Sequence, residues 1–326
     1  MVRMNFKLYS PEVMQRHAEM LGNRVKKNFK ALSKKFDKEH VSAFRLYNLD
    51  IPEIRAVVDW YEGHVILGEY VREQTDHESY LELLSASVAT ALNIPVENVH
   101  IRQRTTRPFE GDRYTRLART NERMEVREGD LKFLVNLDDF LDVGLFTDHR
   151  VTRGIVRDLV KGKRFLNLFA YTGAFSCYAA KGGAKSVTTV DMSRRYLDWA
   201  KDNMELNALT GTCRQEWSST EVREFLERAS LSKNMWDVIF LDPPSFSTRE
   251  GMEPFDILYD HRSLVESTLA VLDKGGVLFF STNHQRFEPD LDGLLSAICT
   301  EITSLTTPVD YKGKTPHRLF QIVKAK

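Results

Sequence analysis

The sequence predicts an α/β protein whose second half is a doubly wound parallel sheet, preceded by a small α+β domain and a basic helical extension. From about residue 138 onward, short apolar β-rich segments alternate with segments of helical periodicity, which is the rhythm of βαβ units. Ahead of that point strand-like segments predominate, and one internal helix is indicated at 76–92. The domains are therefore expected at 1–40, 41–137 and 138–326.

The bulk composition excludes several classes of protein. The chain has 326 residues, of which 42% are hydrophobic and 28% charged, so a packed core is expected rather than disorder. No apolar run reaches the roughly 18 residues of a membrane span, and the N-terminus lacks the apolar core of a secretory signal. Cys177, Cys213 and Cys299 are isolated, so neither a disulfide framework nor a metal site is expected. These features favour a cytoplasmic protein that does not contact a membrane.

Residues 11–40 are predicted to form a long amphipathic helix. Ser10 is a suitable capping residue, and Pro11 suits the first helical position. This segment contains eight lysines and arginines and four acidic residues, which gives a local net charge of 8 − 4 = +4. The basic face is either merely solvated or binds phosphate groups, and Lys27 and Lys30 are the candidates for the second role.

The small domain at 41–137 is predicted to bind rather than to catalyse, because it contains no glycine-rich loop, metal cluster or nucleophile constellation. Its strands are expected at 43–50, 54–63, 64–71, 98–104, 121–129 and 131–137, and its helix at 76–92.

An arginine-rich segment at 102–119 stands out within this domain. Its six arginines are interleaved with Phe109 and Tyr114. Arginine binds phosphate bidentately and aromatic rings stack on unpaired bases, although a solvated hairpin would look similar. Together with the basic helix, the segment favours contact with RNA through Arg102, Arg104, Arg107 and Arg113.

In the second half, the strands and helices alternate. Strands are expected at 163–169, 186–192, 236–242 and 275–282, and helices at 174–182, 193–207 and 261–274. Ligands of such sheets bind beyond the carboxyl ends of the strands.

Two of these strand ends carry features of a nucleotide site. The first is the turn from Asn167 to Gly173, where a glycine lets the backbone approach a ligand closely. The second is Asp191, which ends the next strand 191 − 173 = 18 residues later. An acid at this place accepts hydrogen bonds from the ribose hydroxyls of NAD or of S-adenosyl-L-methionine. Alternatively Asp191 caps the following helix, although Ser193 offers a second cap.

The turn Asp242-Pro243-Pro244-Ser245-Phe246 distinguishes these cofactors. Two prolines stiffen the backbone and remove its N–H groups, so Asp242 and the neighbouring carbonyls become acceptors facing the cleft. Phe246 can stack on a flat base. Such a turn is typical of methyltransferases that act on nucleic-acid bases, whereas an NAD-dependent oxidoreductase does not need it. The prediction is a Rossmann-like class I S-adenosyl-L-methionine-dependent methyltransferase domain.

Several segments of the chain, including this turn, resemble those of a known family. The segments VNLDDFLDVGLFTDHR, FLNLFAYTGAFS, TTVDMSRRYLDWAKDNMELN and DVIFLDPPSFS are similar to the C-terminal (RlmK) half of the bacterial dual 23S rRNA methyltransferases, the RlmKL family. NRVKKNFKALSKKF and IPEIRAVVDWY also fit, so the resemblance covers nearly the whole chain. It implies methylation of guanine N7 in 23S rRNA or a large-subunit precursor. The half that methylates guanine N2 is missing, so a separate guanine-N2 methyltransferase is an expected partner.

The resemblance also implies a set of site residues. Arg150 is the candidate for the methionine carboxylate, or else it pairs with Asp148 or Asp158. Where the family usually has an aspartate for the adenine amino group, this chain has Glu221, so Glu221 or Ser219 takes that role. The implied cofactor-binding residues are Phe146, Asp148, His149, Arg150, Asn167, Phe169, Tyr171, Thr172, Gly173, Asp191, Met192, Ser219 and Glu221, and the catalytic ones are Asp242, Pro243, Pro244 and Phe246.

The residues after the fifth strand restrict the methylated atom. Methylation of cytosine C5 needs a cysteine thiolate, but Ser281-Thr282-Asn283-His284 contains none and Cys299 is expected in a later helical segment. Guanine N7 has a free lone pair and no proton to lose, so positioning suffices. An exocyclic amine fits as well, and so does a non-catalytic RNA-binding assembly factor with a vestigial cofactor site. His317 and Arg318, before the last strand, are further candidates for RNA contact.

Overall fold

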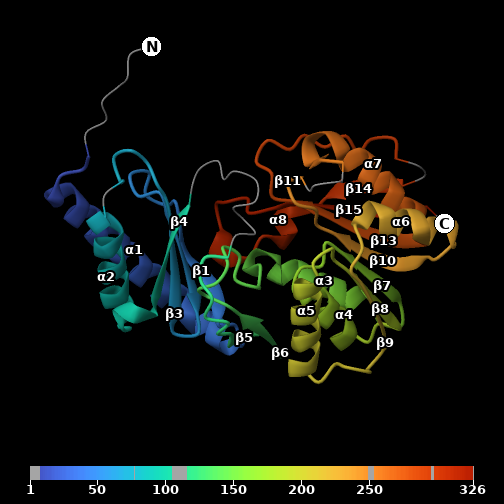
Figure 1. Ribbon diagram of the computed structural model, residues 1–326, viewed down its shortest axis with the longest axis horizontal. Coiled ribbons are helices and arrows are strands. Elements are labelled where there is room, and N and C mark those ends of the chain that lie inside the picture. The colour runs from blue at the N-terminus through green and yellow to red at the C-terminus, as the bar shows by residue number, and fades with distance from the viewer. Residues whose placement is uncertain (1–7, 77, 105–115, 249–252, 295–296, 326) are drawn as a thin grey trace, which may run out of the picture. The chain divides into compact units, whose positions relative to one another are not determined.

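The computed structural model describes residues 8–76, 78–104, 116–248, 253–294 and 297–325 (Figure 1). The chain packs as two compact units, Met1–Asp130 with Val135–Val143 and Leu131–Leu134 with Gly144–Lys326. In the described ranges no helix combines the length and the apolar character that a membrane crossing requires.

In the first unit, helix α1 (Pro11–Lys38) is part of the core rather than a separate extension. Ser10 Oγ accepts a hydrogen bond from Val13 N at 3.4 Å, so the helix begins where the capping pattern predicts. Its buried face, which includes Leu21 and Val25, shares one core with helix α2 and a four-stranded sheet. These elements are α2 (Glu78–Leu92), β1 (Ala43–Asn48), β2 (Ala56–Tyr61), β3 (His64–Tyr70) and β4 (Val99–Arg104), with a 3-10 turn η1 (Val96–Asn98).

The second unit contains the predicted doubly wound sheet. Its seven strands lie in the order β14-β15-β13-β10-β7-β8-β9, and β15 is antiparallel to both neighbours. The strands are β7 (Arg164–Leu168), β8 (Ser186–Val190), β9 (Arg214–Ser218), β10 (Trp236–Leu241), β13 (Leu272–Thr282), β14 (Ala297–Glu301) and β15 (Arg318–Lys324). Outside this sheet, the described residues also form two short two-stranded sheets, β5 (Met124–Glu128) with β6 (Leu131–Val135) and β11 (Phe246–Ser247) with β12 (Phe255–Asp256), of which β5 belongs to the first unit.

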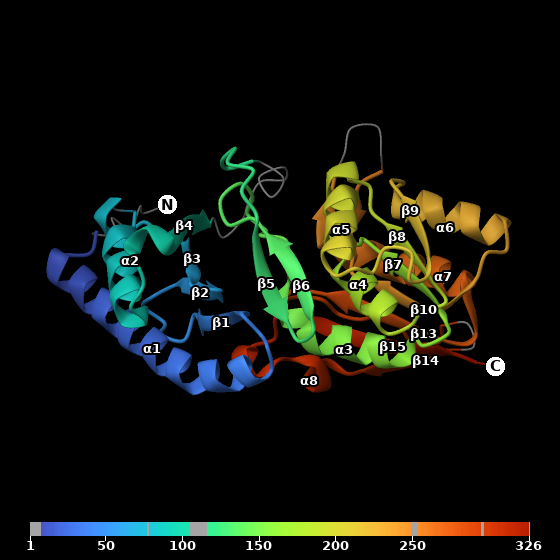
Figure 2. The ribbon, with the colours of Figure 1, turned by 90° about the horizontal axis from the view of Figure 1, so that it is seen from below.

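Helices cover both faces of this sheet (Figures 1 and 2). Leu166 and Leu168 of β7 face a core shared with α6 and α7, whereas Phe240 of β10 stacks on Phe175 of α4 at 3.5 Å between ring centroids. The helices are α3 (Arg150–Leu159), α4 (Ala174–Lys181), α5 (Arg194–Leu206), α6 (Val222–Leu231), α7 (Ile257–Ala270) and α8 (Thr303–Thr306), with 3-10 turns η3 (Thr147–His149) and η4 (Val309–Tyr311). The predicted α/β fold is confirmed.

Two local predictions were wrong. The segment around Cys299 is not helical but forms β14, in which Cys299 pairs with Ile322 of β15. The reason is a period of two: Ala297 and Cys299 pack on the core while Ile298 is 74% exposed. The helix expected at 261–274 begins four residues earlier, because Asp256 caps it by accepting a hydrogen bond from Leu258 N at 2.9 Å.

The strand order reverses between β7 and β10, which is the topological switch point of the sheet. Leu168 and Leu241 are register partners at the carboxyl ends of these parallel strands. The turn that follows β7 and the turn that contains Asp242 therefore begin side by side, as the sequence predicts for the ligand site.

Gly173 is required by packing as well as by its backbone angle. Its φ is +73°, and a Cβ atom there would lie 2.5 Å from the Cβ of Ala200 in α5. The space beside Gly173 is thus filled by α5, so the glycine permits close packing on α5, and its predicted approach to a ligand stays a prediction.

We expect Gly173→Ala to lower the free energy of unfolding by about 2–4 kcal/mol, from the left-handed backbone and the clash together. Gly154→Ala is the matched control, because Gly154 lies within α3 with nothing within 4 Å of an added Cβ. The control should be neutral or stabilise by roughly 0.5–1 kcal/mol. Urea unfolding of both variants without cofactor measures the difference, and equal stabilities would contradict this account.

Candidate active site

The turn after β7 has an unusual backbone. Phe169 and Tyr171 adopt φ values of 53° and 50°, in the left-handed region that non-glycine residues rarely occupy. Such strain persists only when the surroundings hold it, and it is common at functional sites. Here the Asp191 carboxylate accepts a hydrogen bond from Tyr171 N at 2.8 Å, and Asn203 Nδ2 donates to the Thr172 carbonyl at 2.9 Å.

A pocket of about 80 Å³ lies beside this turn. Its volume is below the roughly 300 Å³ of a typical small-molecule site, so it accommodates only one end of a nucleoside cofactor. The exposed side chains of Phe146 and Met192, 42% and 38% exposed, offer surface for the remainder. Seven predicted site residues line the pocket: Phe146, His149, Asn167, Phe169, Tyr171, Thr172 and Asp242.

The arginine of this pocket is Arg153, not Arg150. Arg150 forms a two-pronged ion pair with Asp310, at 3.2 and 3.3 Å, and the two side chains are 11% and 0% exposed. Arg150 therefore already has a buried carboxylate partner, and its predicted contact with the methionine carboxylate stays a prediction. Arg153 is 1% exposed, lines the pocket and donates to the Phe146 carbonyl at 3.0 Å.

A buried arginine at the bottom of a pocket fits an anionic group, such as the carboxylate at one end of S-adenosylmethionine. Sequence reasoning missed Arg153 because helix α3 was not predicted. Once the helix is known, Arg153 lies three residues after Arg150, about one turn farther along.

Asp191 lies at the carboxyl end of β8 and does not cap the next helix. Ser193 is the N-cap of α5 and accepts a hydrogen bond from Tyr196 N at 3.4 Å. Burial raises the pKa of Asp191 to about 6, and hydrogen bonds from the N–H groups of Ser193 and Tyr171 oppose that shift. The carboxylate stays close to the strained turn, where the ribose-binding role predicted for it remains a proposal.

The candidates for the adenine amino group differ in their availability. Glu221 is the N-cap of α6: its carboxylate accepts from Glu224 N at 3.0 Å and pairs with Arg223 at 3.3 Å. Ser219 is exposed and follows Ser218, the register partner of Val190 on the neighbouring strand. The helix cap occupies Glu221, so Ser219 is the better placed of the two.

Asp242 lies between the cofactor pocket and the turn that follows β13. The side chain of Asp242 is 26% exposed. Ser245 Oγ in the same turn donates a hydrogen bond to Asn283 Oδ1 at 2.8 Å, which connects the proline turn to the turn after β13. Burial raises the pKa of Asp242 to about 6, and the Asp148 charge adds to this, while a hydrogen bond with Ser281 and the nearby His317 oppose it. Phe246 is 43% exposed in β11.

A histidine cluster supports Asp242, and sequence reasoning did not foresee it. His149 Nε2 lies 3.6 Å from Asp242 Oδ2 and 3.4 Å from Ser281 Oγ. His317 stacks on His149 with ring centroids 4.2 Å apart, and its Nδ1 lies 2.9 Å from Asp148 Oδ2. His317 is 1% exposed, and its predicted contact with RNA stays a prediction.

Asp148, His149 and His317 have potential metal-ligating atoms within 4.8 Å of one another. We interpret them as a hydrogen-bonded support, because Asp148 already bonds to His317 and His149 Nε2 already faces the Ser281 hydroxyl. Burial lowers the pKa of His149 to about 3, so this imidazole is neutral. The group links residues that are 169 positions apart, which no local motif reveals.

The residues predicted to contact RNA differ in how exposed their side chains are and in whether they have partners within the protein. Lys27 and Lys30 are exposed on α1. Arg102 is 8% exposed and donates to the carbonyls of Ile101 and Leu137, so its prediction as an RNA contact was wrong. Arg318 is partly exposed but pairs with Glu301 at 2.6 Å. Arg104 ends β4, and Arg107 and Arg113 lie outside the described residues.

Comparison with known proteins identifies the relatives of this chain. Residues 50–316 match the family model of S-adenosylmethionine-dependent methyltransferases. The ribosomal RNA large subunit methyltransferase K/L of Syntrophotalea carbinolica is 42% identical over 312 residues, which is 94% of this chain and 43% of that protein. The enzyme of the same name from Allochromatium vinosum is 41% identical, over 92% of this chain and 42% of that protein. The chain therefore spans less than half the length of these relatives.

Solved structures agree on the fold. SMU.776, a methyltransferase crystallised with SAH, superimposes with a TM-score of 0.75 at 22% identity, covering 95% of this chain and 81% of its own. The SAM-dependent methyltransferase of Agrobacterium tumefaciens gives 0.57 at 19% identity, covering 88% and 91% of the two chains. At such low identity these structures speak for the fold alone.

The two arginines can be distinguished by calorimetry with S-adenosylmethionine. We expect Arg153→Lys to weaken cofactor binding about tenfold or more, because lysine cannot replace a bidentate guanidinium. Arg150→Lys, which keeps the charge opposite Asp310, should bind nearly as well as the wild type. A loss confined to Arg150→Lys would restore the assignment drawn from the sequence.

Proposed function

Because this chain belongs to the family of S-adenosylmethionine-dependent methyltransferases, we propose that it methylates large-subunit ribosomal RNA, and that the acceptor atom is N7 of a guanine in 23S rRNA. The identity to enzymes named for the large subunit supports the class of substrate. The single observation that carries methyl transfer to a base is Asp242, an acceptor in a rigid turn at the switch point of the sheet, whereas the choice of N7 rests on the similarity to the family. No cysteine lies in the turn after β13, which argues against a covalent route through cytosine.

Each residue of the turn has a definite task in this proposal. S-adenosylmethionine supplies an electrophilic methyl group. Attack by N7 places a positive charge on the guanine and releases no proton. With a pKa of about 6, Asp242 is mostly ionised at neutral pH and stabilises that charge from a preorganised position. His149 Nε2 lies 3.6 Å from Asp242 Oδ2, and because this imidazole is neutral it does not cancel the charge of the carboxylate.

The acceptor must leave its base stack to reach this turn. Phe246, which is 43% exposed in β11, presents a ring on which a flipped guanine can stack. Pro243 and Pro244 hold Asp242 in place, since a residue without an N–H and with a fixed φ restricts the chain. Positioning of this kind suffices for a nucleophile that already has a free lone pair.

Methylation of an exocyclic base amine is the second candidate, and Asp242 itself favours it. A carboxylate acceptor is well suited to an amino group, which donates hydrogen bonds and loses a proton during methylation. The two candidates differ in the product, 7-methylguanosine or an N-methylated amine, so analysis of the modified nucleotide separates them.

Binding of the RNA is proposed to involve the basic face of α1. Lys27 and Lys30 are exposed there, in a segment with a net charge of 8 − 4 = +4 over residues 11–40. Arg104, Arg107 and Arg113 also remain proposed RNA contacts. A separate guanine-N2 methyltransferase acting on the same rRNA remains the proposed partner.

Mass spectrometry of ribosomal RNA from cells with and without the protein tests the proposed function. We expect one 7-methylguanosine of the 23S rRNA to disappear and to return with the wild-type gene, but not with Asp242→Ala. Loss of an N-methylated amine instead would favour the second candidate. Unchanged rRNA, together with no binding of S-adenosylmethionine, would favour an RNA-binding assembly factor.

The raised pKa of Asp242 predicts an acid limb in the pH profile. The single-turnover rate should rise about tenfold per pH unit below pH 6 and level off above it, because only the ionised carboxylate stabilises the cation. Asp242→Asn should abolish this limb and lower the plateau rate about 10²–10³-fold. Rapid-quench assays at saturating RNA and cofactor give the rates. A limb that survives in Asp242→Asn belongs to another group.

A further inference from the structure

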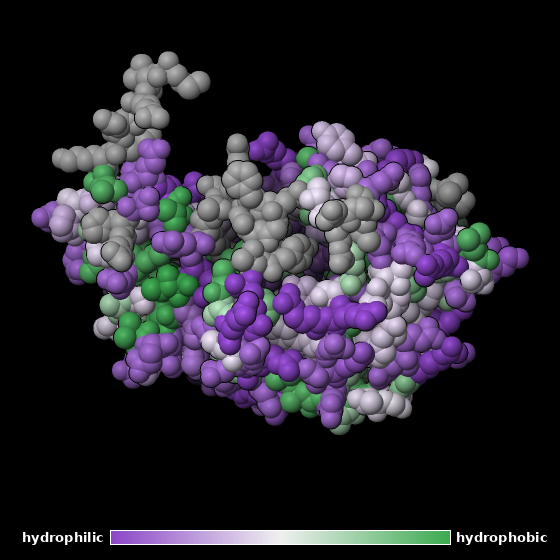
Figure 3. All heavy atoms as spheres, viewed as in Figure 1, coloured by the Kyte–Doolittle hydropathy of each residue, from purple (hydrophilic) through white to green (hydrophobic). Residues whose placement is uncertain are grey.

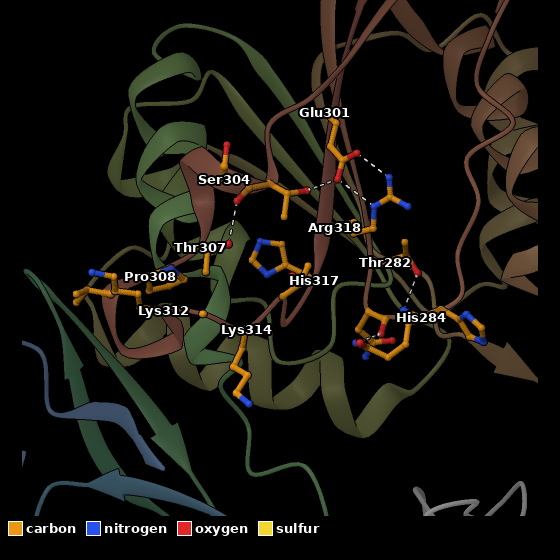
Figure 4. Close-up of a pocket in the computed structure, with 16 residues that line it drawn as sticks. Thr282, His284, Glu301, Ser304, Thr307, Pro308, Lys312, Lys314, His317 and Arg318 are labelled. Atoms are coloured by element: carbon orange, nitrogen blue, oxygen red, sulfur yellow. Dashed lines mark hydrogen bonds and ion pairs between the residues drawn. The ribbon is translucent and has the colours of Figure 1, made fainter. Parts of the chain in front are cut away.

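A second and larger pocket opens at the edge of the sheet where β13 ends and β15 begins (Figure 4). Its volume is about 1060 Å³, at the upper end of the roughly 300–1,000 Å³ of ligand sites. Thr282 at the end of β13 pairs in register with Arg318 at the start of β15, and both line the pocket. It therefore lies at the edge of the sheet where ligands of this fold bind.

The stacked histidines separate this pocket from the cofactor pocket. His149 lines the first pocket and His317 lines the second, with 4.2 Å between the ring centroids. The catalytic turn is also tied to the second pocket, because Ser245 Oγ donates to Asn283 Oδ1 on its wall at 2.8 Å. Both pockets thus adjoin the residues around Asp242. The larger one has room for part of the acceptor RNA.

The lining of this pocket carries an excess of positive charge. Among the described residues, Glu301 is the only acidic one that lines it, and its carboxylate is bound by Arg318 at 2.6 and 2.9 Å. Asp310, within the wall, is 0% exposed and pairs with Arg150. Lys312 and Lys314 are exposed, and no ion pair is seen for either within the described part of the chain. Two uncompensated ammonium groups at a pocket favour an anionic ligand.

The loop that bears these lysines is fixed to the segment that lines the cofactor pocket. The Arg150–Asp310 ion pair anchors η4 to α3, and the hydroxyls of Thr147 and Tyr311 lie 2.8 Å apart. Lys314 N donates to the Tyr311 carbonyl at 3.0 Å, which closes the turn. The backbone beneath both lysines is therefore held in place before any ligand arrives.

We propose that this pocket binds single-stranded RNA beside the flipped base, with Lys312 and Lys314 holding a backbone phosphate. The proposal rests on the proposed function and names a substrate subsite for it. Base flipping leaves the neighbouring backbone splayed, and that backbone needs a cationic support. Hydroxyl and amide groups on the same walls, from Asn283, Gln285, Thr303 and Ser304, suit the 2′-hydroxyls and base edges of RNA.

The test compares two double variants of the full chain. Lys312→Ala/Lys314→Ala removes the pocket's charges. Lys161→Ala/Lys185→Ala is the matched control, because both lysines are exposed at the opposite edge of the same sheet, just before β7 and β8. Fluorescence anisotropy with a single-stranded fragment of 23S rRNA, at several salt concentrations, gives the affinity and its salt dependence. Calorimetry gives the affinity for S-adenosylmethionine.

We expect the pocket variant to bind RNA about tenfold more weakly. The slope of log affinity against log salt should become shallower by roughly 0.7 for each phosphate group that the variant no longer binds. Its KM for RNA should rise while cofactor affinity stays unchanged, and the control should match the wild type. A pocket variant indistinguishable from the control would overturn the proposal. So would an inorganic phosphate site that depends on the lysines while the RNA salt slope does not change.

A failure of the proposed function would give a different experimental result from a failure of the pocket proposal. If the wild type transfers no methyl group to large-subunit rRNA, the proposed function is wrong, yet the salt slopes of the two variants on the RNA fragment still decide whether this pocket binds the RNA backbone.

Discussion

The parallel pairing of β7 with β10 is the interaction on which the site depends. It makes Leu168 and Leu241 neighbours at the switch point, so the strained turn after β7 and the Asp242 turn begin at the same place. In the proposed function the two turns act together, the first toward the cofactor and the second toward the acceptor base. Strain at Phe169 and Tyr171 is tolerable only because β8 and α5 hold the turn through Asp191 and Asn203.

The segment at 147–150 connects the two pockets of the second unit. His149 faces the cofactor pocket and Asp242, while Asp148 binds His317 and Arg150 binds Asp310. One short stretch of chain thus lies against Asp242 and anchors the loop of the larger pocket.

The charged residues show why counting charge along a sequence is a weak guide to a binding surface. Arg102, Arg150 and Arg318 are all held by carbonyls or carboxylates within the protein. The lysines on α1 and beside the larger pocket remain exposed to solvent. Figure 3 shows the hydrophilic side chains that cover much of the second unit on one face. Guanidinium groups form bidentate internal bonds readily, whereas flexible ammonium groups stay in water.

The sequence by itself determined the α/β fold and the dependence on S-adenosylmethionine, whereas the roles predicted for the turn after β7, for Asp191 and for the Asp242 turn remain proposals. These features are local, since periodicity, prolines and strand ends are read within a few residues. Only the tertiary structure decided which arginine faces the cofactor pocket, that Cys299 lies in a strand, and that His317 is buried against His149. Each of these depends on partners far away in the chain, such as Asp310 for Arg150 and Asp148 for His317, which no short pattern encodes.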